Sequence, residues 1–255
     1  MISLFTRDKG KVLAVAKGVR KPRAKLASAL QHFMLGEMQL AVGRRFDVIT
    51  QVRVLEPFYG LRTRMETFAY ASYFAELFDE SLEERQSHPA LFDLLGDALH
   101  RLVQGDPPDL LARYVEISLA AMLGYQPQLS VCVHCQLPLS KVGEDDRVVW
   151  PTWLGFSASH GGALCPACHV QVPGAKRIAA GTVQVAQLLL THGAVALGSL
   201  HLSDRLRREI ESTFRDYLEY RLERKLQSTR FIRDWDEDTQ VTAASDMPES
   251  VAQLE

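Results

Sequence analysis

The first sixty residues show the short alternation of apolar and polar positions that is typical of β-strands. Four strands are predicted, over 2–6, 12–16, 33–42 and 48–55. Between the first two, Asp8-Lys9-Gly10-Lys11 predicts a hairpin turn with Gly10 at positive φ. Strands that are spaced about a dozen residues apart and joined by short turns indicate a small β-barrel or sandwich.

From Leu61 onward the apolar positions follow a helical spacing instead. Apolar residues at i, i+3 and i+4 predict a helix that starts at Leu61 and runs to about residue 77. Pro89 and the Pro107-Pro108 pair mark the first turns of two further helices, and Gly105 and Gly124 end them. This stretch is therefore predicted to be a helical bundle with its aromatic and methionine side chains in the core.

The rest of the chain combines a turn-rich segment with two more helices. One helix is predicted over 182–191 with Thr182 as its N-cap, and a long amphipathic helix follows Ser203. From 236 onward the chain has six acids and no bases, which is typical of a disordered tail. The predicted class is α+β multidomain, with boundaries at 1–60 (β-barrel), 61–130 with 176–235 (helical), 131–175 (turn-rich module) and 236–255 (tail).

Composition indicates an ordinary globular protein. The chain has 255 residues, of which 47% are hydrophobic, and this is enough to build large cores. No apolar run reaches the roughly eighteen residues of a membrane span, and the N-terminus lacks the apolar region of a signal peptide. Four cysteines in this length do not make a disulfide scaffold. We therefore expect a cytoplasmic protein with no membrane partner.

The net charge of −2 conceals a strong asymmetry along the chain. Residues 1–62 carry a net +8, whereas 63–130 carry −7 and 203–255 carry −4. Such asymmetry predicts an anionic partner for the basic part and leaves the acidic helices as the candidate surface for protein partners. The candidate nucleic-acid contacts are Arg7, Lys9, Lys11, Lys17, Arg20, Lys21, Arg23, Lys25, Arg44 and Arg45.

All four cysteines fall into two Cys-x-x-Cys pairs that are 29 residues apart, Cys132 with Cys135 and Cys165 with Cys168. Each pair can direct two sulfur atoms at one ion, and two pairs complete a tetrahedral zinc site. Four thiolates leave no open position for water, so one structural zinc per chain is predicted. A redox-active pair and unpaired buried thiols are the competing interpretations. A nearby histidine as a substitute ligand also stays open, the candidates being His134, His160 and His169.

No catalytic constellation is found along the chain. The nucleophile-elbow, zinc-protease, Walker A and dinucleotide-binding motifs are all missing from the sequence. A zinc-deaminase site is excluded because there is no H-x-E and because Leu164, not proline, precedes Cys165. His160-Gly161-Gly162 is best explained as a hairpin turn. The sequence therefore predicts a protein that is not an enzyme.

Several motifs occur in a specific order along most of the chain. They are Leu4-Phe5-Thr6-Arg7-Asp8-Lys9-Gly10-Lys11, Val15-Ala16-Lys17-Gly18-Val19-Arg20, Leu30-Gln31-His32-Phe33, Gln51-Val52-Arg53-Val54-Leu55-Glu56, Leu123-Gly124-Tyr125-Gln126-Pro127 before Cys132, and Phe156-Ser157 before Gly161-Gly162 and the second cysteine pair. In these motifs and in their order, the chain resembles the RecO family of bacterial recombination mediators.

The resemblance implies an N-terminal OB-fold, a helical domain and a four-cysteine zinc module. It implies binding of single- and double-stranded DNA, strand annealing, and work with RecR and single-stranded-DNA-binding protein to load a recombinase onto DNA. It places the four cysteines at the zinc positions, and it places in the basic barrel loop Lys17, Arg20, Lys21, Arg23 and Lys25.

One departure from the family concerns the start of the barrel. Family members usually have a further strand before the segment that matches Ile2-Ser3-Leu4-Phe5, and this chain begins almost at that segment. An OB barrel needs five strands. We therefore expect a barrel without its first strand. Either the start is truncated relative to the natural protein, or another segment or molecule covers the open edge.

The mode of binding follows from the residue types. A basic barrel face suits the phosphate backbone, and four aromatic rings are candidates for base stacking or for core packing: Phe5, Phe33, Phe46 and Phe58. The chain has no Asn for bidentate contacts to adenine, so we expect sequence-independent binding. Two other functions stay open, an RNA-binding or ribosome-associated zinc protein with an OB-fold, and a scaffold whose basic segment docks an acidic protein.

Overall fold

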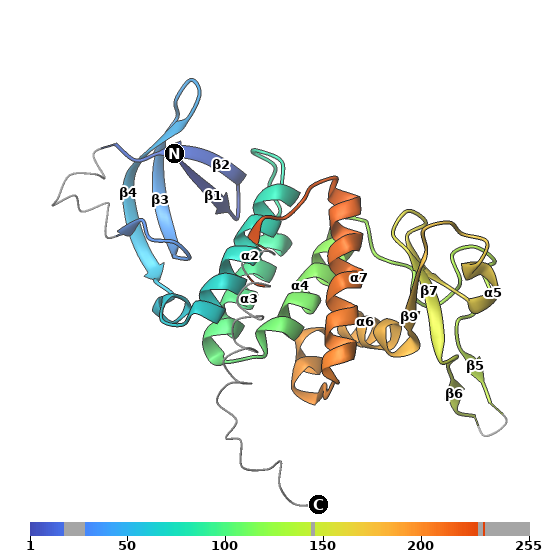
Figure 1. The fold of residues 1–255 in the computed structure, drawn as a ribbon. Coiled ribbons are helices and arrows are strands. Elements are labelled where there is room, and N and C mark those ends of the chain that lie inside the picture. The colour runs from blue at the N-terminus through green and yellow to red at the C-terminus, as the bar shows by residue number, and fades with distance from the viewer. Residues whose placement is uncertain (18–28, 144–145, 229–231, 233–255) are drawn as a thin grey trace, which may run out of the picture.

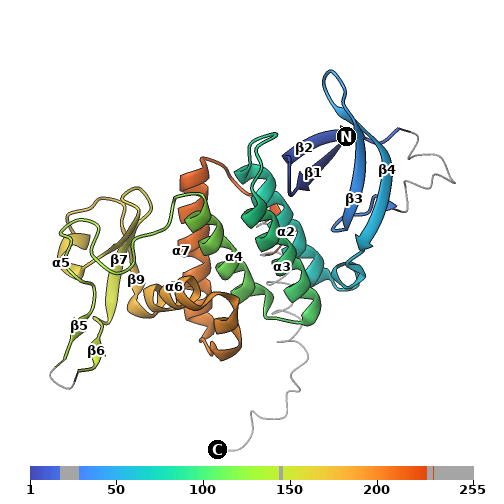
Figure 2. The same ribbon diagram turned by 180° about the vertical axis from the view of Figure 1, so that it is seen from behind.

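The computed structural model describes residues 1–17, 29–143, 146–228 and 232. Along its length lie an N-terminal sheet, a central group of helices and a second, smaller β-region (Figures 1 and 2). The α+β organisation predicted from the sequence is confirmed. The predicted acidic tail lies outside the described residues, as do Arg20, Lys21, Arg23 and Lys25.

The N-terminal sheet has four described strands in the order β1-β2-β4-β3. They are β1 (Ile2–Thr6), β2 (Gly10–Val15), β3 (Leu35–Ala41) and β4 (Asp47–Glu56). β2 pairs in parallel with β4, while β1–β2 and β3–β4 are antiparallel. All four predicted strands are confirmed, and Gly10 has the positive φ, 66°, that the β1–β2 turn was predicted to need.

The helices pack around α4, which contacts α2, α3, α6, η2 and α7. The helical elements are η1 (Tyr59–Arg62), α2 (Met65–Ser81), α3 (Pro89–Gln104), α4 (Pro108–Met122), α6 (Ala180–His192), η2 (Gly193–Ser199) and α7 (Asp204–Leu222). Large buried aromatic side chains fill the space between them, as the sequence predicted: Tyr73, Phe74, Phe78, Phe214 and Tyr217.

The predicted helix ends agree with the structure except at two places. Pro89 and Pro108 each start a helix, Gly105 ends α3 with φ 94°, and the Ser203 hydroxyl caps α7. The prediction that Thr182 caps the next helix is wrong. That helix, α6, starts at Ala180, and Thr182 donates from inside its first turn to the Glu209 carboxylate of α7 at 2.5 Å. The first helix starts at Met65, because residues 59–62 form a 3-10 turn.

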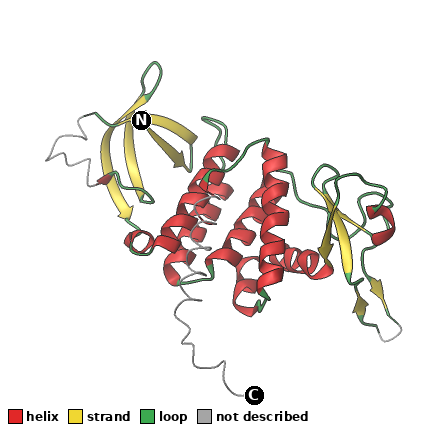
Figure 3. Ribbon diagram, in the orientation of Figure 1, coloured by secondary structure: helices red, strands yellow, loops and turns green. Residues whose placement is uncertain are grey.

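The second β-region carries the cysteines, and its last strand runs directly into a helix (Figure 3). Its elements are β5 (Lys141–Val142), β6 (Val148–Val149), β7 (Trp153–Ser157), β8 (Gly162–Leu164), α5 (Pro166–His169) and β9 (Lys176–Ala179). β7 pairs antiparallel with β8 and with β9, and β9 runs directly into α6. The predicted hairpin turn at Gly161 is confirmed, since its φ is 84° between β7 and β8.

One described segment, Ala180–Ser199, is long and apolar enough to cross a membrane by length and composition alone. Half of this segment is buried inside the structure. Its inward side chains, among them Val183, Ala186 and Leu189, belong to the hydrophobic core, and Thr182 ties it to α7. We therefore interpret it as a core helix.

Candidate metal centre and nucleic-acid interface

The two cysteine pairs converge on one point of the second β-region. Cys132 and Cys135 lie on a turn in which the Gln136 N–H donates to the Cys132 carbonyl. Cys165 immediately precedes α5, and Cys168 lies within this helix. The four sulfur atoms all lie within 4.8 Å of one another, and the Sγ atoms of Cys135 and Cys165 are 3.9 Å apart. All four are free cysteines.

This spacing fits a tetrahedral metal site. With zinc–sulfur distances of about 2.3 Å, the sulfur atoms of a tetrahedron lie about 3.8 Å apart, and a disulfide would need about 2.05 Å. Among the described residues, the cluster of metal-ligating groups consists of the four cysteines and includes no histidine. His160 instead makes hydrogen bonds with Ser157 and Ser159.

The surroundings of Cys132 favour its thiolate. Burial raises the pKa of this thiol, but hydrogen bonds from the backbone N–H groups of Cys135, Cys165 and His134 outweigh burial and lower the pKa to about 7. The opposite holds for Cys168, whose pKa is raised to about 12, mainly by burial. The cluster thus contains one sulfur that ionises near neutral pH, which suits a cation.

Two of the predicted DNA contacts are engaged by acids of the helices. Arg7 pairs with Asp93 of α3, Nη1 to Oδ1 at 2.6 Å. The Lys11 ammonium lies 3.1 Å from the Asp79 carboxylate of α2 and donates to the Asp79 carbonyl at 2.6 Å. These pairs attach the β1–β2 hairpin to the helical region.

The other described candidates project from the ends of the N-terminal strands. Lys9 lies in the β1–β2 turn, Lys17 follows β2, and Arg44 and Arg45 lie between β3 and β4, and all four are exposed. The Arg45 guanidinium lies 5.3 Å from the ring centre of Phe46. The structure therefore brings Lys9, Arg44 and Arg45 to connections between strands, where a polyanion can reach them.

Three of the four candidate stacking rings pack against helices instead. The Phe5 ring lies 6.0 Å from Phe78 and 5.6 Å from Phe92, and the Phe33 ring lies 5.5 Å from Phe68. Phe58 is buried beside His100. Of the two alternatives, base stacking or core packing, the structure thus favours core packing for Phe5, Phe33 and Phe58, because these rings pack against side chains of the helices.

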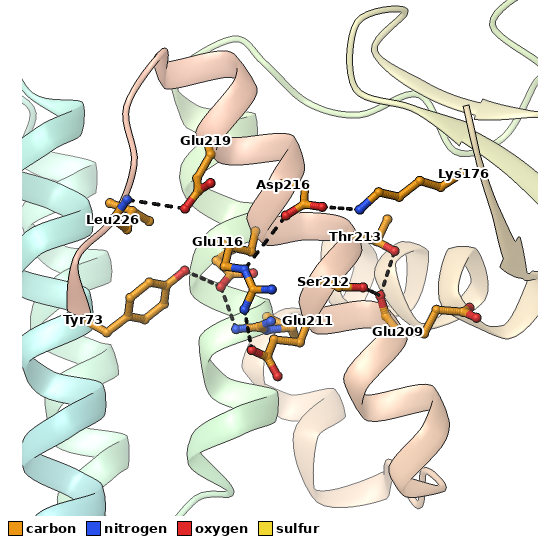
Figure 4. A network of polar contacts seen from close by, with 12 residues as sticks. Tyr73, Glu116, Lys176, Glu209, Glu211, Ser212, Thr213, Asp216, Glu219 and Leu226 are labelled. Atoms are coloured by element: carbon orange, nitrogen blue, oxygen red, sulfur yellow. Dashed lines mark hydrogen bonds and ion pairs between the residues drawn. The ribbon is translucent and has the colours of Figure 1, made fainter. Parts of the chain in front are cut away.

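A buried polar network between the helices was missed by the sequence reasoning (Figure 4). The Tyr73 hydroxyl of α2 donates to Glu116 Oε1 at 2.5 Å, and Arg113 Nη2 donates to the same oxygen at 2.7 Å. Glu116 is fully buried and Arg113 nearly so. A signal existed, because Arg113 and Glu116 are one helical turn apart in an otherwise apolar stretch.

The network predicts a pH dependence of stability. Burial raises the pKa of Glu116 to about 6, so folding favours its neutral form. The stability from Glu116 is therefore fully present below about pH 4.5 and is lost as the pH rises through 6, a change of about 2 kcal/mol. Thermal unfolding across this window should show wild type losing stability relative to Glu116→Gln. Parallel curves for the two proteins would contradict this.

Both the N-terminal sheet and the remainder of the chain match models of a known protein family. Residues 1–58 match the family model described as "Recombination protein O N terminal", and residues 62–230 match "Recombination protein O C terminal". The "DNA repair protein RecO" of Pelotomaculum thermopropionicum is 36% identical over 232 residues, which cover 91% of this chain and 86% of the relative.

Two further relatives carry the same name. The protein from Symbiobacterium thermophilum is 36% identical over 235 residues, covering 91% of this chain and 89% of its own. The protein from Roseiflexus sp. is 33% identical over 225 residues, covering 88% and 76%. The similarity thus extends over the sheet, the helices and the cysteine cluster together.

Proposed function

Because the chain belongs to the RecO family of DNA repair proteins, we propose that it binds single- and double-stranded DNA without sequence specificity, anneals complementary strands and helps to load a recombinase. The recombinase would be loaded onto DNA coated with single-stranded-DNA-binding protein. The N-terminal domain of this family is an OB-fold, so the predicted fold class, an OB-fold with a helical region and a four-cysteine cluster, is confirmed.

The observation that carries DNA binding is the exposed set of cations on the N-terminal segment. This segment has a net charge of +8, and Lys9, Lys17, Arg44 and Arg45 are exposed on it. Cations that neutralise phosphates release counterions, which supplies affinity for any DNA sequence. Both Nη groups of Arg7 donate to Asp93, and the Lys11 ammonium is held by the carboxylate and the carbonyl of Asp79, so we assign these two residues to holding the OB-fold on the helices.

Metal and protein partners complete the proposal. The four cysteines are assigned one structural zinc, since four thiolates leave no coordination position for substrate water. RecR and single-stranded-DNA-binding protein are the proposed protein partners, and the acidic helical region, net −7 over 63–130, is their candidate surface. The protein is expected to act in the cytoplasm, and none of these steps needs a catalytic residue.

Salt-titrated binding tests the electrostatic footprint. Substituting Arg20, Lys21, Arg23 and Lys25 together by Gln is expected to weaken binding to single-stranded DNA. Each lost phosphate contact should also flatten the slope of log affinity against log salt by about 0.7.

A matched pair of variants controls for net charge alone. Arg20→Gln/Lys21→Gln should flatten the slope, whereas Arg205→Gln/Arg208→Gln on α7 should leave it unchanged. A wild-type slope in the quadruple variant would show that this loop is not the footprint. Competition with RNA of the same sequence separates the alternative, since an RNA-binding protein would prefer that competitor.

A further inference from the structure

The connection between α2 and α3 lies against the part of β2 that β4 leaves unpaired. The Arg85 N–H donates to the Lys11 carbonyl at 2.9 Å, and Lys11 forms a parallel bridge with Glu84. A Cβ on Gly10 would lie 1.8 Å from the Gln86 carbonyl oxygen, so the backbones are in direct contact. The connection therefore lies alongside the first half of β2, and β4 pairs with the second half.

At this junction one buried carboxylate accepts hydrogen bonds from two different loops. Asp47, the first residue of β4, is 2% exposed. Its Oδ1 accepts from the Gly43 N–H at 3.2 Å, and both oxygens accept from Arg85 Nη2 at 3.2 Å. The Gly43 bond is the main reason that the pKa of Asp47 is lowered, and Arg85 and Lys9 lower it further.

The three connections that meet here all carry exposed cations. Gly43 belongs to the β3–β4 loop with Arg44 and Arg45, Arg85 to the α2–α3 connection, and Lys9 to the β1–β2 turn. Figure 1 shows the β3–β4 loop and the α2–α3 connection at the same, upper end of the molecule. Each of the three connections thus presents an exposed cation, and on the α2–α3 connection Arg85 follows the exposed Glu83 and Glu84.

Arg85 keeps hydrogen-bonding capacity while it is held. Its side chain is 54% exposed, and its ion pair with Asp47 uses Nη2. An arginine has five N–H donors in a planar fork that matches phosphate oxygens, and no bond to another described residue occupies Nη1 or Nε. Its backbone φ of 61° is uncommon for a residue other than glycine, and the hydrogen bond to the Lys11 carbonyl holds the backbone in this conformation.

We propose that Arg85 binds a DNA phosphate together with Lys9, Arg44 and Arg45, and that Asp47 is the positioning residue that holds Arg85 and the β3–β4 loop in one surface. The proposal rests on the proposed DNA binding and adds to it a contact from the helical region. The ligand is the sugar-phosphate backbone, so single and double strands are both bound here.

The test is salt-titrated binding of the full chain to an oligonucleotide, as a single strand and as a duplex. Arg85→Gln should flatten the log–log slope by about 0.7 on the single strand and about 0.9 on the duplex. The ratio of wild-type to variant affinity then falls about three-fold between 50 and 200 mM salt. Arg205→Gln, an exposed arginine on α7 with the same charge change, should keep the wild-type slope. An unchanged slope in Arg85→Gln overturns the proposal.

Asp47→Asn separates positioning from charge. It removes a negative charge, so charge alone would tighten DNA binding, whereas loss of positioning weakens binding and flattens the slope. Tighter binding by a variant that unfolds at the wild-type temperature overturns the role of Asp47. If the wild type itself binds DNA without salt dependence, the proposed function fails. If the wild-type slope is steep and Arg85→Gln leaves it unchanged, only the proposed role of Arg85 fails.

Discussion

Replacing Cys132 with serine is expected to abolish metal binding and to unfold the second β-region. Cys132 is fully buried, and its sulfur lies within 4.8 Å of the other three. Structural zinc contributes about 10–16 kcal/mol to the folding of small zinc-finger peptides, as much as the whole stability of a typical domain. The strands β5 to β9 have only two to five residues each, so their ladders contribute few hydrogen bonds beside the core packing of Leu154, Phe156 and Leu164.

Metal content and thermal unfolding measure this effect. Wild type should contain one zinc per chain, and Cys132→Ser none, with a markedly lower unfolding temperature. His160→Ala is the matched control, because His160 lies in the same region and is not part of the cysteine cluster. A wild-type protein that holds no metal, or that a chelator does not destabilise, would reject the site.

Replacing Glu116 with leucine is the second change with a large expected effect. It leaves the buried Arg113 guanidinium of α4 without its nearest carboxylate, and arginine cannot give up its proton. Breaking one side of a buried ion pair costs about 3–5 kcal/mol, a large part of a domain's total stability. Urea unfolding at pH 7.5 should show this loss.

The double variant Arg113→Met/Glu116→Leu tests whether the unpaired charge is the cause. Because both charges are then removed, it should be more stable than Glu116→Leu alone. A double variant that loses as much stability as Glu116→Leu and Arg113→Met lose together as single variants would contradict this explanation. Tyr73→Phe, which removes one hydroxyl from the same carboxylate, should cost only about 1–3 kcal/mol.

The features that could be predicted from the sequence are those determined by local spacing. Alternation along β4 and the proline and glycine positions around α3 and α4 define those elements almost to the residue. The cysteine cluster is equally local, because two Cys-x-x-Cys turns each present a pair of sulfurs.

Features that depend on distant parts of the chain could not be predicted. The strands β5 to β9 have two to five residues each, too few for a periodicity. Thr182 has the residue type of an N-cap but faces Glu209, which lies 27 positions later. Arg85 carries no local signal, because its place beside Asp47 is set by contacts between residues 38 positions apart.

The α2–α3 connection beside β2 also determines the order in which the protein can fold during synthesis. The Lys11 carbonyl and the Asp47 carboxylate both find their partner in Arg85, which leaves the ribosome later than every strand of the sheet. A nascent OB-fold therefore remains incomplete at this edge until α2 and the following loop have emerged. Contacts between distant residues slow folding, so the N-terminal sheet is expected to consolidate together with the first helices and not ahead of them.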